Sequence, residues 1–238
     1  AHIVHIDVIS GVPAWLNRTF GKTAAPNQLL PRWYTEGFAT YEESARTGGG
    51  RVRSSLFTMY LRAMWLDGEV FDLGELSGSP RAWPGGSAWY LYGSHFLAWV
   101  AQTRGEDIFR RFHAEFGSLL LPYSMNTVMR ETVGEDFVSM WTQWLAYLDE
   151  RFTAELAGRR AAGLTEVEPV TKTGRDTWFV RSRPGHDEVT WSQSPPSEQR
   201  AIFRKNLVTG EVDRLVQPEG LTRSHAWGPR GRFLVYDN

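Results

Sequence analysis

The sequence predicts a mainly α-helical domain followed by a short all-β segment, and three observations carry this prediction. Apolar residues recur with a helical period of about 3.6 residues through the first two thirds of the chain. After Gly163 the period changes to about two residues, which is typical of strands with one buried face. Glycine and proline mark the connections, as at Trp83-Pro84-Gly85-Gly86. We therefore expect a helical domain over residues 1–160, a linker over 161–175 and a β domain over 176–238.

The longest helix is expected just before the change of period. It should begin after Gly134-Glu135-Asp136 and end near Gly158 or Gly163. Its apolar face consists of side chains at spacings of three and four: Phe137, Met140, Trp141, Trp144, Leu145, Leu148 and Phe152. The same reasoning predicts helices over 54–66, 87–103 and 106–116, and a helix that follows Pro31 and runs to about Ser44.

Short strands are expected in the last quarter of the chain, over 177–180, 188–191, 201–204 and 233–236. Residues 206–212 should form a strand, a tight turn at Thr209-Gly210 and a returning strand. These strands are too few to close a sheet, so the β segment is expected to be part of a larger one.

Composition excludes several classes of protein. The 26 basic residues nearly balance the 27 acidic residues, which argues against a nucleic-acid-binding surface or a polybasic membrane surface. The chain has no cysteine, so disulfides, thiolate catalysis and cysteine-ligated zinc are excluded. No apolar run reaches the roughly 18–20 residues that a transmembrane helix needs.

The candidate functional residues lie in three polar clusters: residues 2–7 with His2 and His5, residues 30–43 around Glu36, and residues 89–96. Glu36 should lie in the first turns of a helix, among aromatic and small residues that would bury its carboxylate. An unpartnered buried carboxylate is costly, so it needs a cation or a metal ion. The simpler interpretations are a glutamate stabilised by the helix dipole and two structural histidines.

The residues around Glu36 resemble a motif of the gluzincin zinc metallopeptidases, and specifically of the peptidase-MA-like domain. The segment Trp33-Tyr34-Thr35-Glu36-Gly37-Phe38-Ala39-Thr40-Tyr41 matches the pattern Trp-x-x-Glu-Gly-x-Ala-x-Tyr of a ligand helix. Ala1-His2 resembles the last two positions of His-Glu-x-x-His. The tail over 226–236 is similar to the Trp-Ser-Pro-Asp-Gly-x-x-Leu-x-Tyr signature of TolB-like propeller blades.

The resemblance implies a fold class: the helical half of a zincin-type metallopeptidase domain, then an all-β segment of an incomplete β-propeller. It also implies a Zn²⁺ site in which His2 and Glu36 are ligands, with Tyr90 or Tyr92 donating to the oxyanion. The first histidine and the general-base glutamate would precede Ala1, so the chain by itself is expected to be inactive. In the full protein, metal-activated water would hydrolyse a peptide or protein substrate.

Further expectations follow from the same resemblance. The propeller would bind a protein partner, and the protein would be periplasmic or secreted. Thr40 stands where some gluzincins carry an aspartate that supports a zinc histidine, and Asp7 or His5 could take that supporting role.

Several alternatives stay open. The chain could be a non-catalytic peptidase-like module that binds protein partners. It could also be a carbohydrate-active enzyme that uses Glu42 or Glu43 in a tryptophan-lined cleft, although adjacent helical carboxylates cannot face each other across a bond. Tyr90 and Tyr92 could be core aromatics, and His95 a buried structural histidine.

Overall fold

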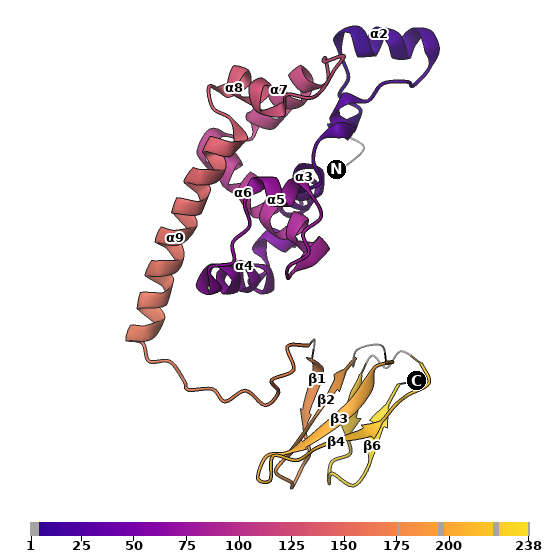
Figure 1. The fold of residues 1–238 in the computed structure, drawn as a ribbon, viewed down its shortest axis with the longest axis vertical. Helices are drawn as coiled ribbons and strands as arrows, with labels where there is room; N and C mark the ends of the chain where they lie inside the picture. Colours follow the sequence, from indigo (N-terminus) through magenta and orange to yellow (C-terminus); the bar gives the residue numbers. More distant parts are fainter. Residues whose placement is uncertain (1–4, 176, 195–197, 221–223, 238) are drawn as a thin grey trace. The chain divides into compact units, whose positions relative to one another are not determined.

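The computed structural model describes residues 5–175, 177–194, 198–220 and 224–237 (Figure 1). The chain divides into two compact units, Ala1–Leu164 and Thr165–Asn238. The first unit is helical and the second consists of strands, which confirms the predicted order of a helical part and a β part. None of the described helices is both long and apolar enough to cross a membrane.

The helical unit contains longer helices joined by short loops and 3₁₀ turns. Its described helices are α2 (Gly11–Phe20), α3 (Arg32–Arg46), α4 (Ser55–Asp67), α5 (Leu73–Ser77), α6 (Ala88–Arg104), α7 (Asp107–Phe116), α8 (Met125–Val133) and α9 (Phe137–Ala161). The 3₁₀ turns are η1 (Pro26–Leu29), η2 (Arg51–Arg53) and η3 (Gly85–Ser87). The helices predicted from periodicity correspond to α3, α4, α6, α7 and α9, each within about two residues at either end.

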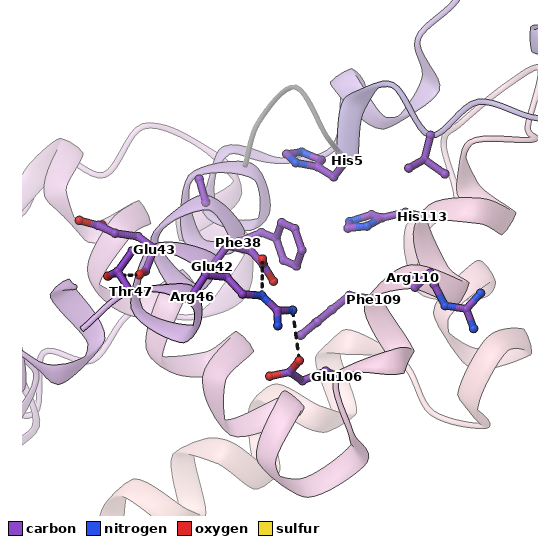
Figure 2. A pocket seen from close by; sticks show the side chains of 12 residues that line it. His5, Phe38, Glu42, Glu43, Arg46, Thr47, Glu106, Phe109, Arg110 and His113 are labelled. Atoms are coloured by element: carbon purple, nitrogen blue, oxygen red, sulfur yellow. Dashed lines mark hydrogen bonds and ion pairs between the residues drawn. The ribbon is translucent and has the colours of Figure 1, made fainter. Parts of the chain in front are cut away.

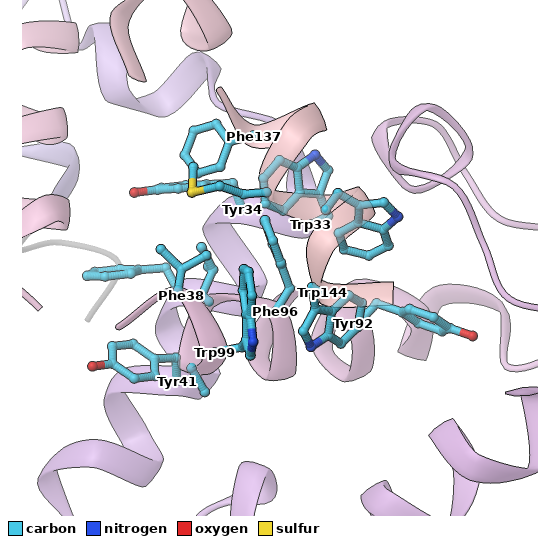
Figure 3. Close-up of a cluster of buried hydrophobic side chains, with 14 of the residues drawn as sticks. Trp33, Tyr34, Phe38, Tyr41, Tyr92, Phe96, Trp99, Phe137 and Trp144 are labelled. Carbon is cyan, nitrogen blue, oxygen red and sulfur yellow. The ribbon is translucent and has the colours of Figure 1, made fainter. Parts of the chain in front are cut away.

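Helix α6 is the centre of the helical unit, since every residue from Leu91 to Ala101 is buried. Its Phe96 ring lies edge-on to Trp141 of α9, with ring centroids 4.9 Å apart. Trp33 of α3 contacts Phe137 of α9 in the same way, at 5.5 Å. Figure 3 shows Trp33, Phe96 and Phe137 gathered into one cluster with other aromatic side chains. Large aromatics therefore fill the space between the three helices, as the high tryptophan content requires.

A pair of glycines lets α3 and α6 approach each other closely. A Cβ atom added to Gly37 of α3 would lie 2.5 Å from the carbonyl carbon of Gly93 of α6. Real Cβ atoms do not come so near to another backbone, so neither helix can carry a side chain here. This contact fixes which turns of α3 and α6 lie side by side.

The second unit contains an antiparallel four-stranded sheet that is not closed. Its strands are β1 (Thr177–Ser182), β2 (Glu188–Gln193), β3 (Ala201–Asn206) and β4 (Val212–Val216), paired in that order, while β5 (His225–Trp227) pairs with β6 (Leu234–Tyr236). The β3–β4 turn includes the predicted Thr209-Gly210, but it is longer than predicted: β3 ends at Asn206 and β4 begins at Val212, so Leu207 and Val208 belong to the turn and not to a strand. The Asn206 side chain accepts the N–H groups of Val208 and Thr209, and Gly210 takes a positive φ of 76°.

The two sheets of this unit meet through a buried polar contact. The hydroxyl of Thr190 on β2 lies 3.0 Å from Nε2 of His225 on β5. Trp191 of β2 and Phe203 of β3 are cross-strand partners, and their rings stack with centroids 6.0 Å apart. The second unit thus has a small core of its own, built from β2, β3 and β5.

Candidate functional site

Glu36 and Tyr90 come together where α3 and α6 are in contact. Glu36 lies on the second turn of α3, one residue before Gly37, and Tyr90 lies on the first turn of α6. Both side chains are half-buried. The pKa of Tyr90 is raised, first by burial and then by the hydrogen bond and negative charge of Glu36. Two residues that the sequence singled out separately are therefore direct neighbours.

Two arginines flank this pair. The guanidinium carbon of Arg51 lies 5.1 Å above the ring of Tyr90, and that of Arg32 lies 4.8 Å above the ring of Trp89. Both positive charges act to lower the pKa of Tyr90, but burial and Glu36 outweigh them. The phenol is consequently protonated at neutral pH and can donate a hydrogen bond.

Tyr92 has a different environment from Tyr90. Its side chain is 0% exposed, and its hydroxyl donates to Sδ of Met64 at 3.2 Å. The ring packs edge-on against Phe71 and Trp144. Burial raises the pKa of Tyr92 above its ordinary value. Residues two apart on a helix point to opposite sides, which explains why only Tyr90 reaches Glu36.

The other predicted metal ligand, His2, lies outside the described residues. Within the described part of the chain no cluster of three or more histidine, aspartate or glutamate side chains is arranged to hold a metal ion. The described residues therefore supply one donor of the expected set, the carboxylate of Glu36. A half-buried carboxylate on a rigid helix suits a zinc ligand, so Glu36 fits this role.

Thr40 adds a second observation near Glu36. It lies one turn further along α3, is 0% exposed, and its hydroxyl has no hydrogen-bond partner in the described part of the chain. Buried hydroxyls normally have a partner. An unpartnered hydroxyl at this place fits a group that would orient a metal ligand, although the family pattern has an aspartate here.

His5 and Asp7, the other supporting candidates, have separate partners. Asp7 is exposed and forms an ion pair of 2.6 Å with Lys22. His5 is 1% exposed and stacks on His113 of α7, with ring centroids 5.2 Å apart. His113 also hydrogen-bonds to the hydroxyl of Tyr34, at 2.8 Å. Sequence reasoning missed His113, because its helical period marks it only as one member of the buried face of α7.

A cavity of about 550 Å³ lies between α3, α7 and the segment around His5 (Figure 2). Phe38, Phe109 and His113 form its apolar wall, and charged groups form its rim. On this rim Arg46 bridges Glu42 and Glu106, at 3.2 Å each. Glu36 and Tyr90 do not line this cavity. The cavity is thus a neighbouring feature and not part of the Glu36 site.

The carboxylates of Glu42 and Glu43 do not act as a pair. Glu42 binds Arg46, while Glu43 forms an ion pair of 3.0 Å with Arg51. Each carboxylate therefore has its own cation on a different side of α3. This arrangement gives no support to the carbohydrate-active alternative, which needs two carboxylates facing one bond.

His95 lies in the interior of α6. Its Nδ1 atom is 2.9 Å from the carbonyl oxygen of Leu91, and burial lowers its pKa. A carbonyl only accepts, so Nδ1 carries the proton and the ring is neutral. These features agree with the interpretation of His95 as a buried structural histidine.

Fold and site together define a protein of two units. The first is helical and has a Glu–Tyr pair between two tightly packed helices, and the second is a small antiparallel β unit. No protein-family model, curated protein or solved structure matches this chain. The resemblance to gluzincins and TolB-like blades therefore stays a prediction.

Proposed function

We propose that this chain belongs to a zinc-dependent metallopeptidase of the gluzincin type. In this proposal Zn²⁺ is held by Glu36, His2 and a histidine ahead of Ala1, where the general-base glutamate would also lie. The observation that supports it is the hydrogen bond between Glu36 and Tyr90 across the α3–α6 contact. It joins the expected ligand to the expected oxyanion donor, although 54 residues separate the two in sequence (90 minus 36).

Each residue would have a distinct task. A zinc ion held by Glu36 and His2 would supply a Lewis acid for the scissile carbonyl and would lower the pKa of a water molecule. Glu36 holds its carboxylate at a fixed place, since α3 cannot shift along α6 at the glycine contact. Tyr90 stays protonated because its pKa is raised, and it donates to the negative oxygen that develops on the peptide carbonyl. Thr40 would orient a ligand histidine through its buried hydroxyl.

The proposal also includes what the resemblance implies for the rest of the chain. The substrate is a peptide or protein, the β unit is part of a TolB-like propeller that binds a protein partner, and the protein is periplasmic or secreted. The four-stranded antiparallel meander supports a blade, since a propeller blade has four such strands.

Zinc binding is the decisive measurement. The protein that includes the residues preceding Ala1 should contain stoichiometric zinc by mass spectrometry of the metal. Glu36→Gln should lose most of this zinc, because a neutral amide is a poor zinc ligand. Glu43→Gln, on the same helix but exposed and paired with Arg51, is the matched control and should keep it. Full zinc content in Glu36→Gln, or none in the unaltered protein, contradicts the ligand assignment.

A second candidate function is a non-catalytic module with the same fold. The two candidates differ in peptide hydrolysis: chelator-sensitive cleavage of an unstructured protein such as casein supports the peptidase. Intact casein in the presence of fully bound zinc supports the binding module.

A further inference from the structure

A group of cationic and aromatic side chains lies beside Glu36, and all of them except Tyr90 are without a role in the chemistry above. It consists of Arg32, Arg51, Trp89 and Tyr90, and we call it the arginine–aromatic cradle. Arg32 is exposed and stands one helical turn before Glu36 on α3. Both arginines are close enough to the Tyr90 hydroxyl to act on its charge. The cradle therefore borders the site where a peptide would meet Glu36.

Trp89 is held as a fixed platform for Arg32. Its Nε1 donates to the carbonyl oxygens of Leu76 at 3.0 Å and Gly78 at 3.1 Å, at the end of α5. The guanidinium carbon of Arg32 lies 4.8 Å above this anchored ring. An anchored aromatic face limits the freedom of the arginine, so less entropy is lost when a ligand binds to it.

The two arginines of the cradle differ in their ionic partners. Arg51 is neutralised by Glu43, at 3.0 Å. Arg32 forms no ion pair in the described part of the chain, and its guanidinium lies over the face of Trp89. A guanidinium stacked on a ring keeps its in-plane N–H groups available, and these match the two oxygens of a carboxylate.

We propose that Arg32 binds a carboxylate of the peptide ligand next to Glu36. This inference rests on the proposed function for the nature of the ligand, a peptide. The carboxylate comes either from the C-terminus of the peptide or from an aspartate or glutamate side chain. Among the described residues Arg32 has no ionic partner, and one guanidinium fits one such group. Arg51 already pairs with Glu43 and lies over the ring of Tyr90.

The test compares three short ligands by isothermal titration calorimetry. They are an N-acetylated apolar tripeptide with a free C-terminal carboxylate, the same tripeptide as an amide, and the amide with one glutamate. Binding is measured in chelator, so that zinc does not contribute. At least one carboxylate-bearing peptide should bind about tenfold or more tightly than the neutral amide. Which of the two binds best identifies the source of the carboxylate.

Three variants test whether Arg32 causes the preference for carboxylate-bearing peptides. Arg32→Gln should abolish the preference, and Arg32→Lys should recover a small part of it, because lysine has charge but no planar fork. Arg18→Gln on α2 removes another exposed arginine and should leave the preference for a carboxylate unchanged. Circular dichroism of each variant checks that the helices are intact.

The outcomes separate this inference from the zinc proposal. Equal binding of the three ligands, no binding of any of them, or an equal loss in Arg18→Gln overturns the role of Arg32. A preference that Arg32→Gln abolishes supports the role even where zinc content shows that Glu36 is no ligand. Zinc bound through Glu36 without any carboxylate preference supports the peptidase and overturns the cradle as a carboxylate site.

Discussion

Gly37 of α3 and Gly93 of α6 are in backbone contact, and this contact determines that Glu36 lies beside Tyr90. The added Cβ of an alanine at Gly37 would come within 2.5 Å of the Gly93 carbonyl carbon. A flexible side chain could yield, but a helix backbone cannot. The glycine that follows the candidate ligand in sequence is thus a packing residue that positions the site.

Substitution of this glycine should destabilise the helical unit. We expect Gly37→Ala to lower the free energy of unfolding by about 1 to 3 kcal/mol, since the new methyl group forces the helices apart. Gly48→Ala is the control, because no atom lies within 4 Å of its added Cβ. Urea unfolding followed by circular dichroism at 222 nm reports the helices. Equal midpoints for Gly37→Ala and the unaltered chain would disprove the tight contact.

The start of α9 allows a second stability test. Asp136 accepts the N–H of Ser139 at 2.8 Å, and this bond, together with Arg130, lowers the pKa of Asp136 to about 2. Asp136→Ala should cost about 1 kcal/mol in the same urea assay, while Asp136→Asn keeps the capping oxygen and should cost less. An alanine variant as stable as the asparagine variant argues against the cap.

The helices predicted from the sequence were those with long regular apolar faces, such as α9. The sequence analysis missed α2, α5 and α8 because short helices bury few residues and so have little periodicity. The Asp72 capping box of α5 was a usable signal, since Glu75 follows three residues later.

The candidate site could also be predicted only in part, because sequence motifs report neighbours along the chain and not contacts between distant segments. The motif around Glu36 singled out that residue, and the aromatic cluster singled out Tyr90 together with Tyr92. Only the crossing of α3 and α6 distinguishes the two tyrosines. The pairing of His5 with His113 depends on contacts between segments more than 100 residues apart (113 minus 5 is 108). Sequence periodicity carries no record of such contacts.

His113 should make the helical unit less stable in acid. Burial, with a smaller contribution from the charge of His5, lowers the pKa of His113 from 6.5 to about 3. Between these two values the unfolded chain binds a proton that the folded chain does not, so stability is lost as the pH falls from 6.5 towards 3. By pH 4.5 this contribution is about 2 to 3 kcal/mol.

The measurement is urea unfolding at pH 7 and pH 4.5. His113→Gln can still accept from Tyr34 but does not titrate, so its loss of stability between the two pH values should be smaller by about 2 to 3 kcal/mol. His186→Gln changes an exposed histidine of the β unit and should show the same loss as the unaltered chain. The same pH dependence in His113→Gln would show that other groups cause the acid sensitivity.

The two tyrosines of α6 offer the sharpest test of the proposed chemistry. Tyr90→Phe removes the hydroxyl that lies against Glu36, and it should lower kcat for peptide hydrolysis about 100-fold to 1,000-fold, as loss of an oxyanion donor does. Its effect on stability should be small, because the side chain is only half-buried. Tyr92→Phe is matched in chemistry and helix, but it removes a hydroxyl that contacts Met64 in the core.

We therefore expect Tyr92→Phe to leave kcat within about twofold of the unaltered protein, since its hydroxyl is buried and donates to Met64. Steady-state kinetics on one fluorogenic peptide, with zinc content measured for each variant, separates a catalytic effect from metal loss. A fall in kcat for Tyr90→Phe at full zinc content assigns the donor role to Tyr90. If Tyr90→Phe keeps a kcat equal to that of Tyr92→Phe, Tyr90 is not the oxyanion donor, because loss of such a donor slows the chemical step.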